Sequence, residues 1–324
     1  MVPPSVIAIG EILVDFIPNE IAVLKDLDSF QKCPGGAPAN YIVGLACLGV
    51  DVAFIGKVGD DPFGEYLREV LISESVDTTN LVKAKNGERT TLAFVYFDAE
   101  MDRDFFFYRK NAADINLTSE EIKSDLFREV SYLHFGSVSL TDEPIRSATF
   151  QAIDLCKQRG GKVCFDPNIR TSLWETKEEM RAQIELALEK VDIFLPSQNE
   201  LEFFYNEKEF DEQKAVNDLF EKYPLELVVV KKGKEGCLIK ERSGHFLTIP
   251  SFDVEIIDTT GAGDGFNVGF IFGLLNDLSL EEAGIIGNAI GALVIQKKGA
   301  MTSLPNKNDL EEFLAKQNIP IKLK

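Results

Sequence analysis

The sequence predicts an α/β protein with a central, mostly parallel β-sheet covered by helices on both faces, together with a small second β-sheet. Short apolar runs typical of buried strands alternate with longer helical stretches, and one β-prone region interrupts that alternation. Strands that are buried on both faces and separated by helices indicate a parallel sheet built from right-handed β-helix-β units. The predicted strands are residues 6–9, 52–55, 133–135, 163–165, 193–195 and 227–230, and the main predicted helices are residues 39–48, 63–74, 145–159 and 178–191.

The interrupting region predicts the second sheet. Residues 90–98 and 103–109 are rich in β-prone side chains, no helical stretch separates them, and residues 98–102 form the predicted turn. This pattern is typical of an antiparallel hairpin. We expect the hairpin to join part of residues 13–32 in a small separate sheet, and the alternative is an edge hairpin of the main sheet.

The length of 324 residues fits one large α/β domain or two smaller ones, and a composition of 45% hydrophobic residues is that of a soluble globular protein. No internal repeat or linker is recognised in the chain. The formal net charge of -19 argues against nucleic acid or an anionic membrane surface as partner. The first residues lack the pattern of a signal peptide and predict a strand. The five widely spaced cysteines fit no zinc or redox motif, so we expect free, mostly buried thiols in the cytoplasm.

A glycine-rich turn at residues 258–266 is the most informative segment of the chain. Gly261, Ala262 and Gly263 stand directly before Asp264 and an apolar, helix-compatible stretch. Small residues at a helix start leave backbone N–H groups accessible, and the helix dipole favours an anion there. A carboxylate at the same turn could accept a proton from an attacking hydroxyl, which together indicates phosphoryl transfer. The alternative is simple helix capping by Asp258 and the threonines.

A second segment of small residues precedes the predicted helix near residue 40. Gly35 and Gly36 carry no side chain that would keep a ligand from the backbone. Asn40 stands at the helix N-terminus, where its amide could bind a hydroxyl or could only cap the helix.

Both segments resemble the signature motifs of the pfkB (ribokinase-like) family of carbohydrate kinases, and of its fructokinase branch in particular. Asp258-Thr-Thr-Gly-Ala-Gly-Asp264 is similar to the C-terminal motif, and Gly35-Gly-Ala-Pro-Ala-Asn40 is similar to the N-terminal one. Further segments extend the resemblance over almost the whole chain. It implies a ribokinase-like fold in a single domain of residues 1–324. The small sheet, from about residues 13–32 and 88–112, would be a lid over the sugar site and often also a homodimer surface.

The resemblance also implies site residues. Asp264 would be the general base, and the backbone of Gly261, Ala262 and Gly263 would be the anion hole. The implied sugar ligands are Glu11, Asp15, Gly35, Gly36, Asn40, Phe107, Arg109 and Arg170. The implied nucleotide contacts are Asn199, Lys231, Gly233, Gly236, Gly261, Gly263 and Asn288. Glu202 would organise Mg²⁺ through water, and Asp258, Thr260, Gly299 and Ser303 match positions that hold a monovalent cation such as K⁺ in relatives.

The expected reaction is transfer of the ATP γ-phosphoryl group to the terminal hydroxyl of fructose, which gives fructose 6-phosphate and ADP. Residues 103–109 resemble the fructokinase lid. In the alternative, 2-keto-3-deoxygluconate kinase, a tyrosine typically stands where this chain has Phe107. A catalytically inert sugar-binding homologue is less favoured, because the motif carboxylates are intact. A dehydrogenase is disfavoured, because no Gly-x-Gly-x-x-Gly follows the first strand.

Overall fold

The computed structural model describes residues 3–20, 22–97, 103–205 and 210–323. Its main sheet has the strand order β13-β12-β11-β10-β9-β8-β1-β4-β5, and the strands from β5 to β11 are parallel. The predicted parallel sheet is therefore confirmed, and β12 and β13 add an antiparallel edge. The parallel strands are β1 (Val6–Ile9), β4 (Val52–Val58), β5 (Asp77–Lys83), β8 (Tyr132–Gly136), β9 (Lys162–Asp166), β10 (Ile193–Phe194) and β11 (Leu227–Lys231), and the edge strands are β12 (Cys237–Glu241) and β13 (Phe246–Ile249).

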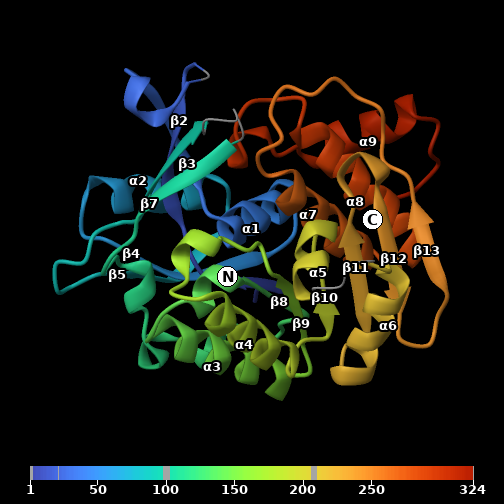
Figure 1. The fold of residues 1–324 in the computed structure, drawn as a ribbon, viewed down its shortest axis with the longest axis horizontal. Coiled ribbons are helices and arrows are strands. Elements are labelled where there is room, and N and C mark those ends of the chain that lie inside the picture. The colour runs from blue at the N-terminus through green and yellow to red at the C-terminus, as the bar shows by residue number, and fades with distance from the viewer. Residues whose placement is uncertain (1–2, 21, 98–102, 206–209, 324) are drawn as a thin grey trace.

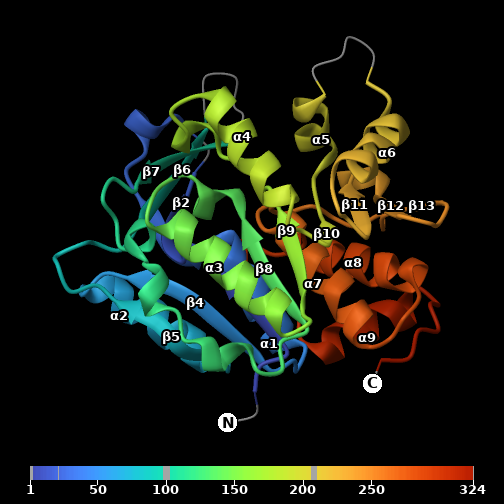
Figure 2. The same cartoon turned by 90° about the horizontal axis from the view of Figure 1, so that it is seen from below.

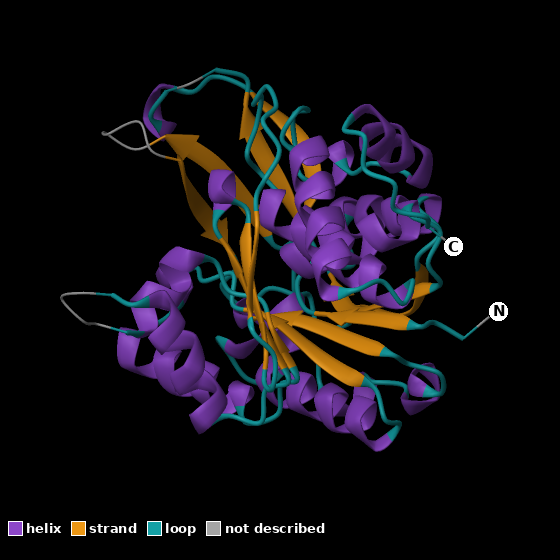
Figure 3. Ribbon diagram, turned by 90° about the vertical axis from the view of Figure 1, so that its right-hand side faces the viewer, coloured by secondary structure: helices purple, strands orange, loops and turns teal. Residues whose placement is uncertain are grey.

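Helices cover both faces of this sheet, as Figures 2 and 3 show. One face packs against α1 (Ala37–Cys47), α2 (Pro62–Ser73), α7 (Ala262–Leu275), α8 (Leu280–Val294) and α9 (Lys307–Lys316). The other face packs against α3 (Ile145–Gln158), α4 (Lys177–Leu188), α5 (Gln198–Phe204) and α6 (Glu212–Lys222). The near-continuous apolar runs of the strands follow from this double cover. Among the described helices, none is long and apolar enough to cross a membrane.

A separate small sheet has the strand order β3-β2-β6-β7 and lies above α1 in the view of Figure 1. Its strands are β2 (Leu13–Pro18), β3 (Phe30–Gly35), β6 (Leu92–Phe97) and β7 (Arg103–Tyr108). β6 and β7 form the predicted antiparallel hairpin, and β6 pairs with β2 in parallel. The alternative of an edge hairpin of the main sheet is therefore wrong. The predicted turn at residues 98–102 lies outside the described residues.

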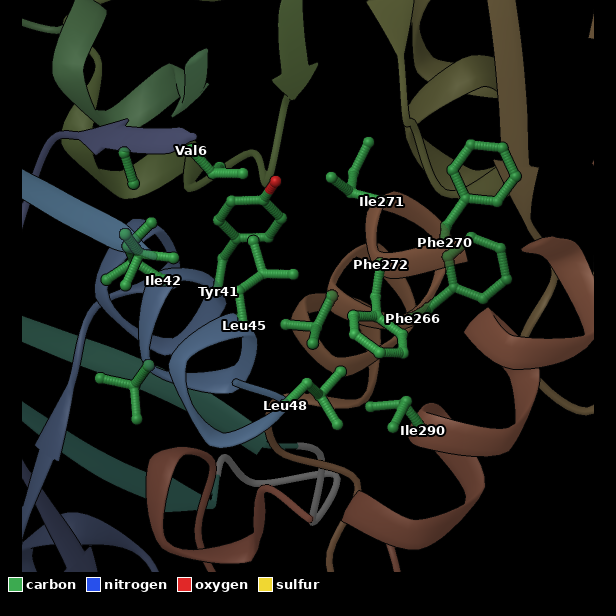
Figure 4. Packing of buried hydrophobic residues seen from close by; sticks show 14 of the residues in the cluster. Val6, Tyr41, Ile42, Leu45, Leu48, Phe266, Phe270, Ile271, Phe272 and Ile290 are labelled. Atoms are coloured by element: carbon green, nitrogen blue, oxygen red, sulfur yellow. The ribbon is translucent and has the colours of Figure 1, made fainter. Parts of the chain in front are cut away.

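The packing of α1, α7 and α8 fixes where the two glycine-rich segments meet. Tyr41 and Leu45 of α1 and Phe266 and Ile271 of α7 are buried in one hydrophobic cluster (Figure 4). α7 and α8 approach closely, since a Cβ atom added to Gly269 would lie 2.5 Å from the Ile286 carbonyl oxygen. The N-termini of α1 and α7 are thereby held near each other, although more than 200 residues separate them in the chain.

Candidate active site

Side chains from both sheets and from the helix N-termini line one large cavity of about 890 Å³. Asp166 and Lys231 reach it from the carboxyl ends of β9 and β11. This is the edge at which open α/β sheets bind their ligands. The small sheet contributes Asp15, Phe105 and Phe107 to the opposite wall. The cavity therefore lies between the main sheet and the small sheet.

The cavity wall includes the buried carboxylate of Asp264, which lies in the first turn of α7 and is 9% exposed. Asn40 of α1 donates a hydrogen bond from Nδ2 to its Oδ2 at 2.8 Å. The pKa of Asp264 is raised to about 6, mainly by burial and in part by Asp166, while Asn40, Lys231 and Arg170 lower it. A carboxyl group with such a pKa is well matched to accept a proton at neutral pH.

The turn before Asp264 requires glycine. Gly261 has a φ of +77° and lies against residue 300, because an added Cβ atom would lie 2.8 Å from the Ala300 Cβ. Among the described residues, no side chain caps α7, which leaves the start of the helix accessible to an anion in the cavity. The Ala262 N–H donates to the Thr259 carbonyl at 3.2 Å, which closes the turn, so this member of the predicted anion hole is already engaged by the protein.

Two carboxylates line the half of the cavity below the small sheet. Glu11 accepts a hydrogen bond from the Ala37 N–H at 3.2 Å, and its Oε2 is buried with no hydrogen-bond partner among the described residues. Desolvation raises the pKa of Glu11 to about 7. Asp15 lies on β2 beside Gly35, where an added Cβ atom would lie 2.0 Å from the Asp15 Oδ2. The lack of a side chain at Gly35 is therefore required for the position of Asp15. Gly35 itself, predicted as a sugar ligand, is not among the residues that line the cavity.

Arg109 follows β7 and is buried in the cavity wall. Its Nε donates to Asp114 at 2.6 Å, one terminal nitrogen donates to Thr141 at 2.7 Å, and the other donates to the Val138 carbonyl at 3.1 Å. The charge of Arg109 is thus balanced by a protein carboxylate before any ligand binds. Phe107, also predicted as a ligand, lines the same wall with Phe105, which the sequence reasoning did not single out.

A buried ion pair joins the two strand ends in the cavity floor. The Lys231 Nζ lies 2.5 Å from the Asp166 Oδ2, and Asn267 of α7 donates to the same oxygen at 2.5 Å. Arg170 lines the cavity, with its guanidinium 5.2 Å from the centre of the Phe105 ring. Sequence reasoning named Arg170 and Lys231 as site residues but not Asp166, although Asp166 directly follows a predicted strand and opens the same motif as Arg170.

The other half of the cavity is mostly apolar. Gly233, Gly236 and Asn288 line it as predicted for nucleotide contacts, together with Phe252 and Ile256. The Asn288 Nδ2 donates to the carbonyls of Ile249 and Pro250 at 3.2 and 3.1 Å, so this side chain holds the end of β13 in place. Apolar walls of this kind suit the flat face of a base, while Lys231 and Lys234 offer positive charge.

The predicted pair Asn199 and Glu202 does not reach the cavity. Both residues are exposed on α5, and Glu202 accepts a hydrogen bond from Gln198 at 2.8 Å. Ser197 and Glu200 line the cavity instead, because α5 begins with Ser197 as N-cap and Glu200 as its capping-box partner. Glu200 also accepts a hydrogen bond from the Ile169 N–H at 2.7 Å, which turns it toward the strand ends. The sequence interpretation was therefore shifted along the helix by two residues.

The residues predicted to hold a monovalent cation are partly brought together. The Asp258 carboxylate accepts hydrogen bonds from Thr260 and from the Gly299 N–H at 2.9 Å, so it joins two loops beside α7. Ser303 is buried outside the cavity wall and donates to the Ala300 carbonyl at 2.8 Å. Of the four predicted residues, Asp258 and Thr260 bring side-chain oxygens together, and oxygen ligands are those that a hard cation prefers.

The fold and this cavity define the class of protein. A buried carboxylate at the N-terminus of a helix without a side-chain cap, in a cavity with one polar and one apolar half, is what a phosphotransferase needs to join a hydroxyl compound to a nucleotide.

Comparison with known proteins identifies the family. Residues 3–307 match the model of the pfkB family of carbohydrate kinases. Fructokinase-1 of Zea mays is 38% identical over 96% of this chain and 98% of its own. A Xylella fastidiosa fructokinase solved with ATP gives a TM-score of 0.88 at 28% identity, over 97% of this chain and 99% of that one. A Vibrio cholerae fructokinase double mutant, solved with fructose, ADP and potassium ion, gives 0.84 at 34% identity, over 96% and 98%. The chain belongs to the pfkB family, and the predicted class of ATP-dependent sugar kinase is confirmed.

The raised pKa of Asp264 predicts a pH-dependent stability. The folded protein keeps this proton up to about pH 6, whereas the unfolded chain loses it near the ordinary value of 3.8. Ionisation of Asp264 therefore destabilises the fold as the pH rises from about 4 to 6. Because Asp264→Asn cannot ionise, we expect this variant to be more stable than the parent by up to about 3 kcal/mol at pH 8.

Chemical denaturation at pH 8 and pH 4 measures this difference, which should nearly vanish at pH 4. Asp192→Asn is the matched control, since Asp192 is a buried carboxylate paired with Lys157 and should lose stability on neutralisation. A loss of stability for Asp264→Asn at pH 8 would contradict the assignment of a desolvated carboxylate.

Proposed function

We propose that this kinase transfers the γ-phosphoryl group of ATP to the terminal hydroxyl of fructose and releases fructose 6-phosphate and ADP. The observation that carries the proposal is the position of Asp264. Its carboxylate lies between the polar half of the cavity, with Glu11 and Asp15, and the open N-terminal turn of α7. A hydroxyl bound in the polar half would therefore meet the base and the phosphate-binding turn at the same point.

The charges of the polar half favour a neutral sugar. Glu11, Asp15 and Asp264 are carboxyl groups that accept hydrogen bonds from hydroxyls but oppose a second anion. Arg109, the cation that acts on Glu11, is already paired with Asp114 at 2.6 Å. Phe105 and Phe107 offer apolar surface to the carbon face of a sugar ring. These features support fructose over the acidic alternative, 2-keto-3-deoxygluconate, although Arg170 also lines the cavity.

In the proposed reaction, Asp264 accepts the proton of the terminal hydroxyl as its oxygen attacks the γ-phosphorus. A new oxygen–phosphorus bond forms, the bond to the β,γ-bridging oxygen breaks, and ADP leaves with the electron pair. The N–H groups of Gly261 and Gly263 at the start of α7 stabilise the charge on the transferred group. Arg170 also lines the cavity and provides positive charge, as does Lys231, which is paired with Asp166. Closure of the small sheet as a lid would exclude water from this step.

We further propose that Mg²⁺ accompanies ATP and that K⁺ binds beside the turn. Glu200 and Asp166 are the carboxylates that line the cavity near the strand ends, and they suit a hydrated Mg²⁺ held mostly through water. Asp258 and Thr260 are the oxygen donors for the monovalent ion. The bound Mg²⁺ would supply charge neutralisation of the phosphates. The five free thiols of the described chain suit a reducing compartment such as the cytoplasm.

A substrate panel tests the proposed activity. Coupled ADP release should be fast with fructose and ATP, and slow with 2-keto-3-deoxygluconate, ribose and nucleosides. Phosphorus NMR of the product should show a phosphate ester at the terminal carbon. ADP release with the keto-acid but not with fructose would overturn the choice of acceptor, and no release with any sugar would favour a catalytically inert homologue.

Variants of the two neighbouring glutamates, Glu200 and Glu202, test which carboxylate organises Mg²⁺. Because Glu200 lines the cavity and Glu202 does not, we expect Glu200→Gln to raise the Mg²⁺ concentration for half-maximal activity about 10-fold or more. Glu202→Gln, a neighbouring change of the same size, should leave the Mg²⁺ dependence unchanged. Mg²⁺ titration of the activity of both variants at saturating fructose shows which glutamate is needed for Mg²⁺ binding. The reverse result would support Glu202 as the residue that organises Mg²⁺.

The small sheet also supports a homodimer. On β7, Phe106 and Tyr108 are 47% and 62% exposed, on the face opposite Phe105 and Phe107. Tyr108 packs edge-on against Phe94 at 5.7 Å, which extends the aromatic surface onto β6. β7 is also an edge strand of the described sheet, with one long side open to pairing. We propose that a second copy of the chain covers this surface.

Sedimentation equilibrium tests this proposal. The parent protein should sediment as a dimer, and the variant with Phe106→Ser and Tyr108→Ser should sediment as a monomer. Ile72→Ser is the control, because Ile72 is 54% exposed on α2, outside the small sheet. This variant should sediment with the mass of the parent dimer. A dimeric double variant, or a monomeric parent, would contradict the assigned surface.

A further inference from the structure

The loop after β13, residues 250–257, forms part of the wall of the apolar half of the cavity. Phe252, Val254 and Ile256 line the cavity from this loop. Ile256 is nevertheless 62% exposed, which leaves apolar surface that the flat face of a base would cover. The position of this loop therefore affects how well the apolar half fits a nucleotide.

Hydrogen bonds hold the two ends of this loop but not its middle. Near the start, the Ser251 Oγ donates to the Lys234 carbonyl at 2.8 Å. At the end, the Ile257 N–H donates to the Ile295 carbonyl at 2.8 Å. Within the described part of the chain, the backbone groups of residues 252–256 make no hydrogen bond to other backbone groups. The middle of the loop therefore depends on the packing of its side chains.

Helix α9 supports the middle of the loop through an aromatic pair. The Phe313 ring of α9 meets the Phe252 ring edge-on, with 5.1 Å between the ring centres and an interplanar angle of 82°. Phe313 is 8% exposed and is buried in one cluster with Leu310 and Leu314 of the same helix. α9 lies beside α8, as Figures 1 and 2 show, so the pair connects the loop to the body of the protein.

Phe313 lies outside both the cavity wall and the part of the chain that matches the family. It is not among the described residues that line the cavity, so its effect on a ligand would pass through Phe252. The family model matches residues 3–307, whereas α9 spans Lys307–Lys316. Membership of the family therefore assigns no role to this side chain.

We propose that Phe313 is a positioning residue for the donor nucleotide, because it fixes the Phe252 ring and with it the wall against which the base of ATP packs. This inference rests on the proposed function and deepens it, since it assigns the apolar half to the base. Edge-to-face aromatic pairs have a preferred geometry and contribute more than their buried area alone. A wall that is already in place avoids the entropic cost of ordering the loop when ATP binds.

Steady-state kinetics of Phe313→Ala tests this role. The KM for ATP should rise about 10-fold, since loss of the aromatic contact releases the middle of the loop. The KM for fructose, and kcat at saturating ATP, should stay unchanged, because Phe313 takes no part in proton or phosphoryl transfer. Phe313→Leu also removes the ring but keeps more apolar volume. It should show the same rise and provides a second variant if Phe313→Ala does not fold.

Phe220→Ala is the matched control for lost stability. Phe220 is also 8% exposed and also lies on a helix, α6, but it is buried on the other face of the main sheet. Its loss should lower the stability of the fold without raising the KM for ATP. An equal rise of this KM in Phe220→Ala would reduce the effect of Phe313 to lost stability and would overturn the proposal.

Calorimetric titration with ATP, and separately with inorganic tripolyphosphate, gives a readout that needs no sugar. Phe313→Ala should bind ATP about 10-fold more weakly than the parent but bind tripolyphosphate equally well, because tripolyphosphate has no base. Unchanged ATP binding in folded Phe313→Ala and Phe313→Leu, or equal weakening of both ligands, would overturn the proposal. Failure of the proposed function would show separately, as a parent protein that binds ATP but phosphorylates no fructose.

Discussion

The desolvated carboxylate of Asp264 is the constraint on which the rest of the site depends. A carboxyl group buried beside Asp166 would hold its proton too strongly to act as a base near neutral pH. Three groups from separate parts of the chain lower the pKa of Asp264. They are Asn40 from α1, Lys231 from β11, and Arg170 from the loop after β9. The fold must therefore bring a helix N-terminus and two strand ends to one point. The close packing of α1, α7 and α8 on the main sheet does this.

The same arrangement divides the cavity by charge. The chain carries a formal net charge of -19, yet Lys231, Lys234 and Arg170 line the cavity. The Lys231 Nζ would lie 3.7 Å from a Cβ atom added to Gly263 in the first turn of α7. Carboxyl groups dominate the other half, where Arg109 is neutralised by Asp114. An anionic nucleotide and a neutral polyol would each find a complementary half, and Asp264 lies at the boundary. The acidity of the whole chain thus does not exclude a phosphate site, because the cations are local.

Much of the fold and part of the site could be predicted from sequence, for physical reasons that differ by residue. The turn at residues 261–264 is a local feature, since its glycine and the following helix are adjacent in the chain. The buried strands were readable because parallel strands covered on both faces are uniformly apolar. The bond from Asn40 to Asp264 spans 224 positions, so the local pattern gave only two separate motifs.

Other features could not be predicted because they depend on tertiary contacts. The partners of Arg109 include Thr141 and Val138 on a distant segment, so its engagement by the protein was invisible in sequence. Ser197 and Glu200 were missed for a different reason. The segment contains two overlapping pairs with the same spacing, Ser197 with Glu200 and Asn199 with Glu202. Only the residue at which α5 begins determines which pair faces the cavity.

The most direct test of the central claim is the turnover of the Asp264→Asn variant at saturating fructose and ATP. Because the asparagine keeps the size and can still accept from Asn40, binding of both substrates should change little. Loss of the general base should lower kcat by about 10²–10⁴-fold. A variant with near-parental turnover would show that Asp264 is not the base, and the account of this cavity would have to be abandoned.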